Sequence, residues 1–236
     1  MAYILVIVSV PLYAPLVIIS SFFVSRQTTT KLLRAWFAWL FWVFGIKVEF
    51  VNKSSYSSSS QCLVISNHQS HFDIPTCFLT LDGDVRMAAK KELFLIPIFG
   101  QCLAACEFIR VDRKDRKKSR QAAEQIGNAI RGGIQAWVAA EGTRTRDGKL
   151  QPFKSGSFSV AIEAGIPILP FVMVNGFDTF NRSHILPRPG TTIRAVALEL
   201  VSVDGLKPNE RKVLAEKVHD MMEIELNEQR KNIQNV

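Results

Sequence analysis

The sequence predicts an α/β fold, in which a largely buried mixed sheet is flanked by helices and preceded by an N-terminal hydrophobic helical membrane anchor. Three observations lead to this prediction. After residue 46, short apolar runs alternate with helical patterns. The first 24 residues contain no charged side chain. The length of 236 residues, with 47% hydrophobic residues, fits one large domain, which we place at residues 47–236.

The N-terminal segment, residues 1–24, is uncharged throughout. As a helix it would measure about 36 Å at about 1.5 Å per residue, which is enough to reach across a bilayer core. Pro11 and Pro15 would kink it or divide it into a re-entrant pair. A cleaved signal peptide is the alternative, but the segment lacks a basic start and a clear small-residue cleavage site. We therefore expect residues 1–46 to anchor the chain in a membrane.

A second apolar segment, "AWFAWLFWVFGI" at residues 35–46, holds three tryptophans and three phenylalanines and is too short to span a bilayer. Its composition suits the headgroup interface, while a core helix of the folded domain is the alternative. Basic residues follow the first segment at Arg26, Lys31 and Arg34, and none precedes it. The positive-inside rule therefore places the folded domain on the cytoplasmic side of a membrane.

The remaining elements are predicted from apolar runs and helical periodicity. Expected strands are 47–51, 62–66, 106–111, 136–140, 168–174 and 192–201, and expected helices fall at about 74–81, 90–96, 115–131, 156–164 and 208–230. Residues 52–61 form a polar connection. The four cysteines make no CxxC pair, which fits reduced side chains facing the cytosol.

One stretch, "SNHQSHFD" at residues 66–73, gathers polar side chains directly after the apolar run "CLVI". A zinc site is one interpretation, because His68, His71 and Asp73 could supply three ligands. Their spacing would not point all three the same way on a single helix or strand, and no further cluster completes the set. A capping box from Ser70 to Asp73 is a second interpretation, which leaves His68 unexplained.

A third interpretation places His68 in the turn between a strand and a helix, with Asp73 in the first helical turn. The carboxylate would then accept a hydrogen bond from one imidazole nitrogen and fix the tautomer. The other nitrogen would act as a general base toward an incoming hydroxyl. This stretch alone leaves the three interpretations open.

Further motifs follow in fixed order: "ACEFIRVDR", "AAEGTRT" and "AGIPILPFV". Together with "NHQSHFD" they resemble the four motif blocks of the glycerolipid acyltransferase family, best known from the 1-acylglycerol-3-phosphate acyltransferases. The resemblance covers about residues 60–175 and includes "AKKELFLIPIFG" and "FKSG" between the blocks. Two departures are visible: Ala139 and Ala140 stand where the family often has Phe-Pro, and "FIRVDR" replaces a common Phe-Ile-Asp-Arg.

The resemblance implies roles for these residues. His68 would deprotonate the acceptor hydroxyl as it attacks the thioester of acyl-CoA or acyl-carrier protein, and Asp73 would hold the imidazole. No acyl-enzyme is expected, in agreement with the missing Gly-x-Ser-x-Gly motif. The expected reaction is acylation of lysophosphatidic acid at position 2, which gives phosphatidic acid. Another lyso-phospholipid or lyso-lipid is the alternative acceptor. A membrane lipid-binding or metal-dependent hydrolytic protein is the alternative function. Backbone N–H groups at the helix start after Asn67 would meet the oxyanion. Neither a cofactor nor a metal is expected.

The same resemblance places a phosphate site in the second and third blocks. Arg113 and Arg144 match the family's phosphate-binding positions, and a guanidinium binds phosphate through two parallel hydrogen bonds. Glu141, Gly142 and Thr143 complete the turn of the third block. Secondary candidates for contact with the substrate are Asn67, Lys90 and Lys154.

The net charge is +8, and residues 110–120, "RVDRKDRKKSR", hold seven basic and two acidic residues. No aromatic residue interrupts this run, so we do not expect nucleic acid as a partner. A basic rim that attracts the phosphates of coenzyme A, of the acceptor or of anionic membrane lipids is favoured. A solvated helix start is the alternative.

Overall fold

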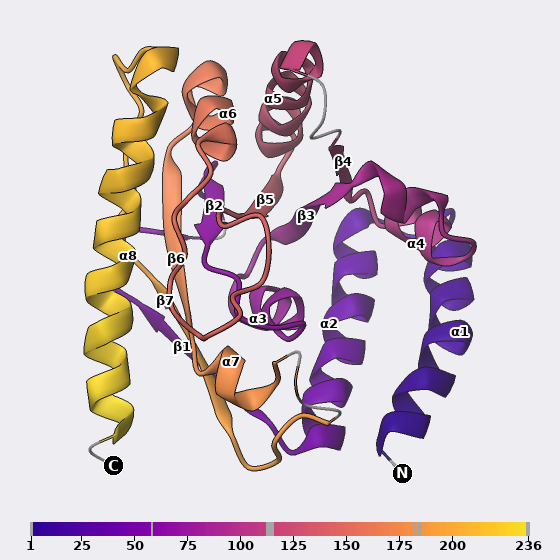
Figure 1. The fold of residues 1–236 in the computed structure, drawn as a ribbon. Helices are drawn as coiled ribbons and strands as arrows, with labels where there is room; N and C mark the ends of the chain where they lie inside the picture. The colour runs from indigo at the N-terminus through magenta and orange to yellow at the C-terminus, as the bar shows by residue number, and fades with distance from the viewer. Residues whose placement is uncertain (1, 58, 112–115, 182, 184–185, 235–236) are drawn as a thin grey trace.

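The computed structural model describes residues 2–57, 59–111, 116–181, 183 and 186–234 (Figure 1). Its centre is a seven-stranded sheet in the order β1-β7-β6-β2-β5-β3-β4. Neighbouring strands are parallel except for the antiparallel pair β6 and β7, so the sheet is mixed. The strands are β1 (Lys47–Asn52), β2 (Leu63–Ser66), β3 (Asp84–Lys90), β4 (Ile109–Val111), β5 (Ile134–Ala139), β6 (Ile168–Val174) and β7 (Thr192–Ala197).

Helices cover both faces of the sheet (Figure 1). They are α1 (Ala2–Ser21), α2 (Arg26–Phe44), α3 (Asp73–Thr80), α4 (Phe99–Ala105), α5 (Arg116–Arg131), α6 (Gly156–Ala164), α7 (Gly176–Thr179) and α8 (Arg211–Gln234), with 3₁₀ turns η1 (Lys91–Leu95) and η2 (Pro208–Glu210). Successive side chains of a strand point to opposite faces. In β2, Leu63 and Ile65 therefore pack with α5, α6 and α8, while Val64 packs with α2 and α3. The predicted α/β sheet with flanking helices is confirmed.

Several elements differ from the prediction. Strand β3 was not expected, because its sequence, "DVRMAAK", carries charges at three of seven positions. One of them, Arg86, is fully buried and donates hydrogen bonds to the Thr30 hydroxyl at 3.0 Å and the Val85 carbonyl at 2.8 Å. Strands β4 and β7 are shorter than expected, the expected helix at 90–96 is a 3₁₀ turn, and α4 and α7 are additional.

Helix α2 packs as part of the folded domain. Leu33, Phe37 and Leu40 are buried against the same face of the sheet as α3. The Arg34 guanidinium binds the carbonyls of Phe78 at 2.8 Å, Leu81 and Gly83, where α3 ends and its last carbonyls lack helical partners. The core-helix interpretation of residues 35–46 therefore holds for one face of α2.

The opposite face of α2 exposes Trp42 to 77%. In the described part of the chain, no helix combines the length and the apolar character needed to cross a membrane. Membrane anchoring by residues 1–46 stays a prediction.

Candidate active site

The site is built on the turn between β2 and α3, at the carboxyl end of a central strand. The turn is fixed first by Asn67, whose side-chain amide donates to the Met173 carbonyl at 2.9 Å and accepts from the Met173 N–H at 2.7 Å. Both ends of this buried amide are thus bound to β6. Asn67, a secondary candidate for substrate contact, ties the turn to the neighbouring strand.

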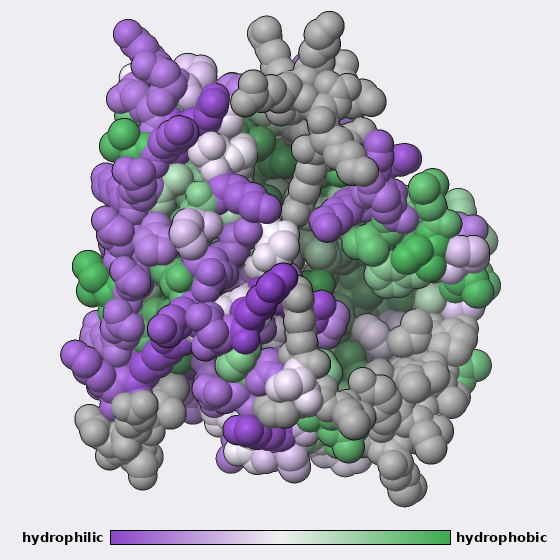
Figure 2. Space-filling model, in the orientation of Figure 1, coloured by the Kyte–Doolittle hydropathy of each residue, from purple (hydrophilic) through white to green (hydrophobic). Residues whose placement is uncertain are grey.

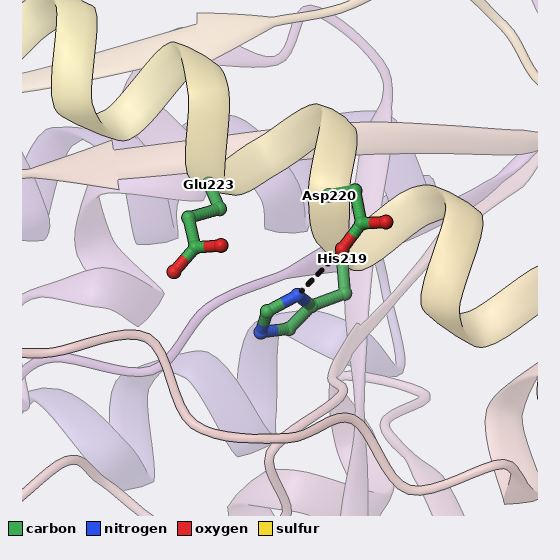
Figure 3. Close-up of side chains that lie close together, drawn as sticks. All are labelled: His219, Asp220 and Glu223. Carbon is green, nitrogen blue, oxygen red and sulfur yellow. Dashed lines mark hydrogen bonds and ion pairs between the residues drawn. The ribbon is translucent and has the colours of Figure 1, made fainter.

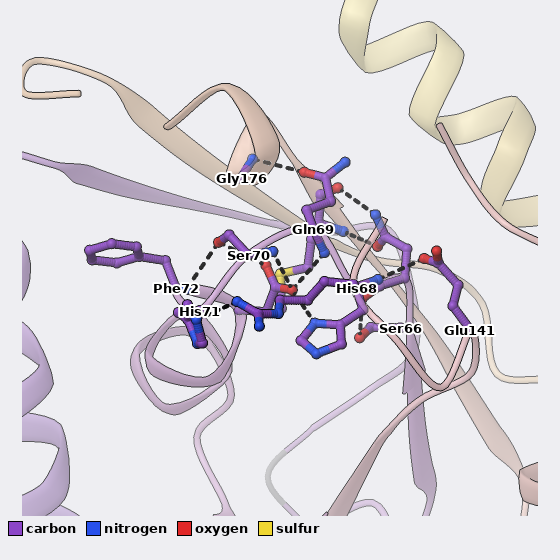
Figure 4. A network of polar contacts seen from close by, with 12 residues as sticks. Ser66, His68, Gln69, Ser70, His71, Phe72, Glu141 and Gly176 are labelled. Atoms are coloured by element: carbon purple, nitrogen blue, oxygen red, sulfur yellow. Dashed lines mark hydrogen bonds and ion pairs between the residues drawn. The ribbon is translucent and has the colours of Figure 1, made fainter. Parts of the chain in front are cut away.

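His68 and Asp73 meet across this turn. Figure 4 shows the His68 side chain within the network of polar contacts. Nδ1 of His68 lies 2.6 Å from Oδ2 of Asp73, and the same oxygen accepts the N–H groups of Gln69 at 2.7 Å and Ser70 at 3.0 Å. The Asp73 side chain is fully buried, while that of His68 is 20% exposed. With Nδ1–H donating to the carboxylate, Nε2 is the nitrogen that can take a proton from a substrate. The structure brings this pair together as the third interpretation expected.

The N–H groups that follow Asn67 are bonded to carboxylates. His68 N–H donates to Oε1 of Glu141 at 2.7 Å, and those of Gln69 and Ser70 donate to Asp73. The prediction that N–H groups here meet an oxyanion is therefore wrong for these three. Ser70 is not the N-cap of α3 either, because the helix begins at Asp73 with Phe72 as N-cap.

The third block encloses His68 from the other side. Its carboxylate Glu141 binds the His68 N–H, and Thr145 N–H donates to the His68 carbonyl at 2.8 Å. Gly142 has φ +74°, and a Cβ there would approach Nζ of Lys154 to 2.8 Å. The positive φ favours glycine at this position. The Lys154 ammonium lies beside this turn, and Thr143 is exposed. Both backbone groups of His68 are thus held by residues more than seventy positions away.

Glu141 is buried, and its Oε2 has no hydrogen-bond partner among the described residues. Burial raises the pKa of this carboxyl to about 7, against the lowering effect of the backbone hydrogen bonds from His68 and Gln151. The folded protein therefore holds a proton here that the unfolded chain releases at lower pH.

We expect this proton to appear in the pH dependence of stability. Because the pKa rises from 4.5 to about 7 on folding, the free energy of unfolding should fall by roughly 3 kcal/mol as the pH rises between these values, and stay level above them. Glu141→Gln keeps an acceptor for the His68 N–H and should lack this decline. Denaturant unfolding of both proteins from about pH 5 to about pH 8 measures the difference. Parallel curves would contradict the prediction.

His71 contacts the third block through Arg144, whereas the imidazole bonded to Asp73 is that of His68. Its Nε2 contacts Nη1 of Arg144, and its ring lies 6.0 Å from that of Phe180. The proposed metal set of His68, His71 and Asp73 is therefore not gathered at one point. The contact brings the guanidinium of Arg144 to the turn that carries His68.

The other basic candidates are placed differently. Arg113 and its neighbours at 112–115 lie outside the described residues. Lys90 is exposed at the end of β3, and β5 separates that strand from β2 in the sheet. In the sheet order, Lys90 is therefore two strands away from the His68 turn.

One group of ligand-type side chains lies elsewhere, on α8 (Figure 3). His219, Asp220 and Glu223 have ligand atoms within 4.8 Å of one another, the only such group among the described residues. Both carboxylates are exposed, and His219 packs edge-on against Phe153 at 5.1 Å. No residue of the four blocks belongs to this group.

Sequence reasoning missed two residues that support Asp73. Oε1 of the buried Gln69 accepts the N–H groups of Gly176 at 2.8 Å and Phe177 at 3.3 Å, which ties the turn to the start of α7. A Cβ at Gly176 would lie 3.2 Å from Oδ1 of Asp73. The available signal was a glutamine inside the first block and a glycine just after the expected strand 168–174.

An apolar cavity of about 310 Å³ opens beside His71. It lies where α2, α3 and the segment after α7 meet, and is lined by Leu40, Phe44, Phe72, Pro75, Phe180 and Pro187 as well as His71. Its walls are almost entirely hydrocarbon. The arrangement therefore places an apolar chamber, a guanidinium and a histidine–carboxylate pair around one turn.

Comparison with known proteins agrees with this arrangement. A family model described as Acyltransferase matches residues 47–174, which span the first block, the third block and the strands between them. The crystal structure of the 1-acyl-sn-glycerophosphate acyltransferase from Thermotoga maritima superposes with a TM-score of 0.77 and covers 97% of this chain and 93% of that one. At 23% sequence identity, that likeness establishes the fold.

Sequence relatives extend the match. The 1-acyl-sn-glycerol-3-phosphate acyltransferase of Haemophilus influenzae is 30% identical over 84% of this chain and 82% of its own length. The alpha enzyme of that name from Ovis aries is 31% identical over 82% and 68% of the two chains. Fold, site and family model together define an acyltransferase enzyme. The chain belongs to the glycerolipid acyltransferase family of the 1-acylglycerol-3-phosphate acyltransferase type.

Proposed function

We propose that this enzyme transfers an acyl group from acyl-CoA or acyl-carrier protein to the sn-2 hydroxyl of lysophosphatidic acid, which forms phosphatidic acid. One observation carries the proposal: the Arg144 guanidinium contacts His71, on the same turn that carries the His68–Asp73 pair. A hydroxyl that bears a phosphate nearby can then meet both a general base and a cation. The names of the relatives from Haemophilus influenzae and Ovis aries support this acceptor.

The chemistry follows from the two nitrogens of His68. Nε2 takes the proton of the acceptor hydroxyl as its oxygen attacks the thioester carbonyl, while Nδ1–H stays bonded to the buried Asp73 carboxylate, which stabilises the imidazolium. The tetrahedral intermediate then expels the thiolate, which receives the proton from Nε2. No acyl-enzyme forms in this scheme, and neither a metal nor a cofactor takes part.

The acceptor is held by charge and by apolar contact. Arg144, whose guanidinium lies beside the turn, would bind the phosphate of the acceptor, and Arg113 of the second block is proposed to bind it as well. Glu141, Gly142 and Thr143 shape the loop that presents Arg144. The apolar cavity beside His71 suits part of an acyl chain. Because such substrates reside in membranes, we propose that the enzyme acts at the cytoplasmic face of a bilayer.

Acyl transfer to a panel of lyso-lipids tests the proposal. Membranes that contain the protein are supplied with labelled acyl-CoA or acyl-carrier protein in the presence of a chelator. Labelled phosphatidic acid should form from lysophosphatidic acid faster than any other product. Faster acylation of another lyso-phospholipid would favour the alternative acceptor, and a requirement for metal would refute the mechanism.

Replacement of Arg144 by lysine keeps the charge but removes the planar pair of donors. We expect the KM for the lyso-lipid acceptor to rise about tenfold or more, with little change in the KM for the acyl donor. Steady-state kinetics with each substrate varied in turn measures both constants. Arg146→Lys, at an exposed position in the same loop, is the control. Equal effects on the two KM values would place Arg144 at the donor's phosphates.

A further inference from the structure

A short segment between β3 and α4 exposes an unusual run of large apolar side chains. We call residues 95–99 the apolar turn. In it Leu95 is 72% exposed, Ile96 46%, Ile98 51% and Phe99 43%. Single exposed hydrophobic residues are normal on protein surfaces, but four among five consecutive residues form a contiguous apolar patch.

The backbone holds the apolar turn in place. Phe99 N–H donates to the Pro97 carbonyl at 2.7 Å, and Ile98 between them has φ +66° and ψ −52°. This is the rare and strained form of the γ-turn, and a β-branched residue at its centre is a conformational outlier. Gly100 N–H binds the Ile96 carbonyl at 2.7 Å, and a Cβ at Gly100 would collide with the Phe94 carbonyl. The exposed side chains are therefore carried by an ordered backbone, which is strained at Ile98.

Basic residues flank the apolar turn. Lys90, just before η1, is exposed, and the guanidinium of Arg110 lies 6.0 Å from the ring centroid of Phe94. Arg110 is also the first residue of the run 110–120, with its seven basic and two acidic residues. Two acidic residues, Glu92 and Glu107, lie between Lys90 and Arg110 in the sequence, and Glu107 is paired with Arg26 at 2.8 Å. Apolar side chains beside an excess of positive charge match an anionic lipid surface, where hydrocarbon lies beneath negative headgroups.

Helix α1 extends the same side of the molecule. It packs against α4, and it exposes Leu12, Leu16 and Ile19, whose spacing puts them on one helical face. Figure 2 shows hydrophobic residues gathered over η1 and α4 at the right of the view, while hydrophilic residues cover most of α8 at the left. The apolar turn and the exposed face of α1 therefore belong to the end of the molecule opposite α8.

We propose that the apolar turn inserts into the acyl region of an anionic bilayer, with Lys90 and Arg110 at the headgroups. It would form a contact with the membrane from within the folded domain, in addition to any contact made by residues 1–46. The inference rests on the proposed function, because a lyso-lipid acceptor would bring the enzyme to a bilayer. The vesicle-binding experiment needs no substrate, so the insertion and the proposed function can be refuted independently of each other.

A fluorophore at residue 95 tests the insertion directly. The full-length protein with Leu95→Cys carries an environment-sensitive dye, and Cys102→Ser removes the one partly exposed cysteine among four. Vesicles of phosphatidylcholine and phosphatidylglycerol contain lipids with nitroxide groups on their acyl chains. We expect the dye to be quenched when vesicles are added. The matched control is Ile224→Cys on α8, 70% exposed against 72% for Leu95, which should remain unquenched.

An affinity measurement complements the dye. Leu95→Ser/Ile98→Ser should bind the same vesicles about tenfold or more weakly, because each side chain would lose its transfer into hydrocarbon. Ile224→Ser should bind like the wild type. A dye at residue 95 that stays in water on vesicle-bound protein would overturn the inference. The inference would also be overturned if, without vesicles, the dye left water as the protein concentration rose. That result would indicate that a second copy of the chain covers this surface. If no lyso-lipid were acylated while the dye inserted, the proposed function alone would fail.

Discussion

We expect His68→Ala to lower acyl transfer by about 100-fold or more while leaving the protein folded. The reason is chemical, because the variant lacks the imidazole that Asp73 orients, while the other imidazole of the turn, His71, contacts Arg144. The fold should survive, since the bonds that hold residue 68 to Glu141 and Thr145 come from its backbone. Initial rates with lysophosphatidic acid, together with thermal unfolding, measure both effects.

Two neighbouring substitutions make this prediction specific. Asp73→Asn should also cause a large loss, because the amide cannot accept the three N–H bonds and balance an imidazolium as the carboxylate does. His71→Ala is the matched control, and it should retain far more activity, since His71 contacts Arg144 and not the pair. More than a tenth of the wild-type rate in His68→Ala would refute the general base. Equal losses at His68 and His71 would revive the metal interpretation.

We expect deletion of residues 1–46 to prevent folding, because it removes α2 from the core. Four large apolar side chains of α2 are buried: Leu33, Phe37, Leu40 and Phe41. At about 1.5–3 kcal/mol for each buried side chain, their loss amounts to roughly 6–12 kcal/mol. That is comparable to the whole stability of a typical domain, about 5–15 kcal/mol. The carbonyls of Leu81 and Gly83 would also lose the Arg34 guanidinium.

Deletion of residues 1–24 is the matched comparison. It keeps Ser25, whose hydroxyl accepts the Thr28 N–H and caps α2, and removes only α1 and the turn. This protein should fold and unfold cooperatively, at a lower temperature because buried Val17 is lost. Circular dichroism and limited proteolysis of both truncated proteins in detergent provide the measurement. A stable, cooperative protein after deletion of residues 1–46 would show that α2 is dispensable for the fold.

The sequence by itself determined the family, the α/β class and the chemical core of the site. Apolar residues in consecutive positions marked β2 and β6 as strands buried on both faces, and their bounds agree closely with 62–66 and 168–174. The pairing of His68 with Asp73 was also predictable, because both partners lie within one turn of chain and the geometry is local. The order of the blocks indicated that Arg144 belongs with them, although only the fold shows the contact through His71.

Only the tertiary structure decided what surrounds that pair. Glu141 holds the His68 N–H across 73 positions of sequence, and Gln69 reaches Gly176 across 107. The charged residues in its sequence kept β3 from being predicted, because a buried Arg86 fits a strand only when distant residues such as Thr30 bind its guanidinium, here at Nη1. The N–H groups of His68, Gln69 and Ser70 are not available to an oxyanion, because carboxylates from two segments already accept them. Periodicity and motifs report the local chain, whereas burial and hydrogen bonding between distant segments are settled only when the strands assemble.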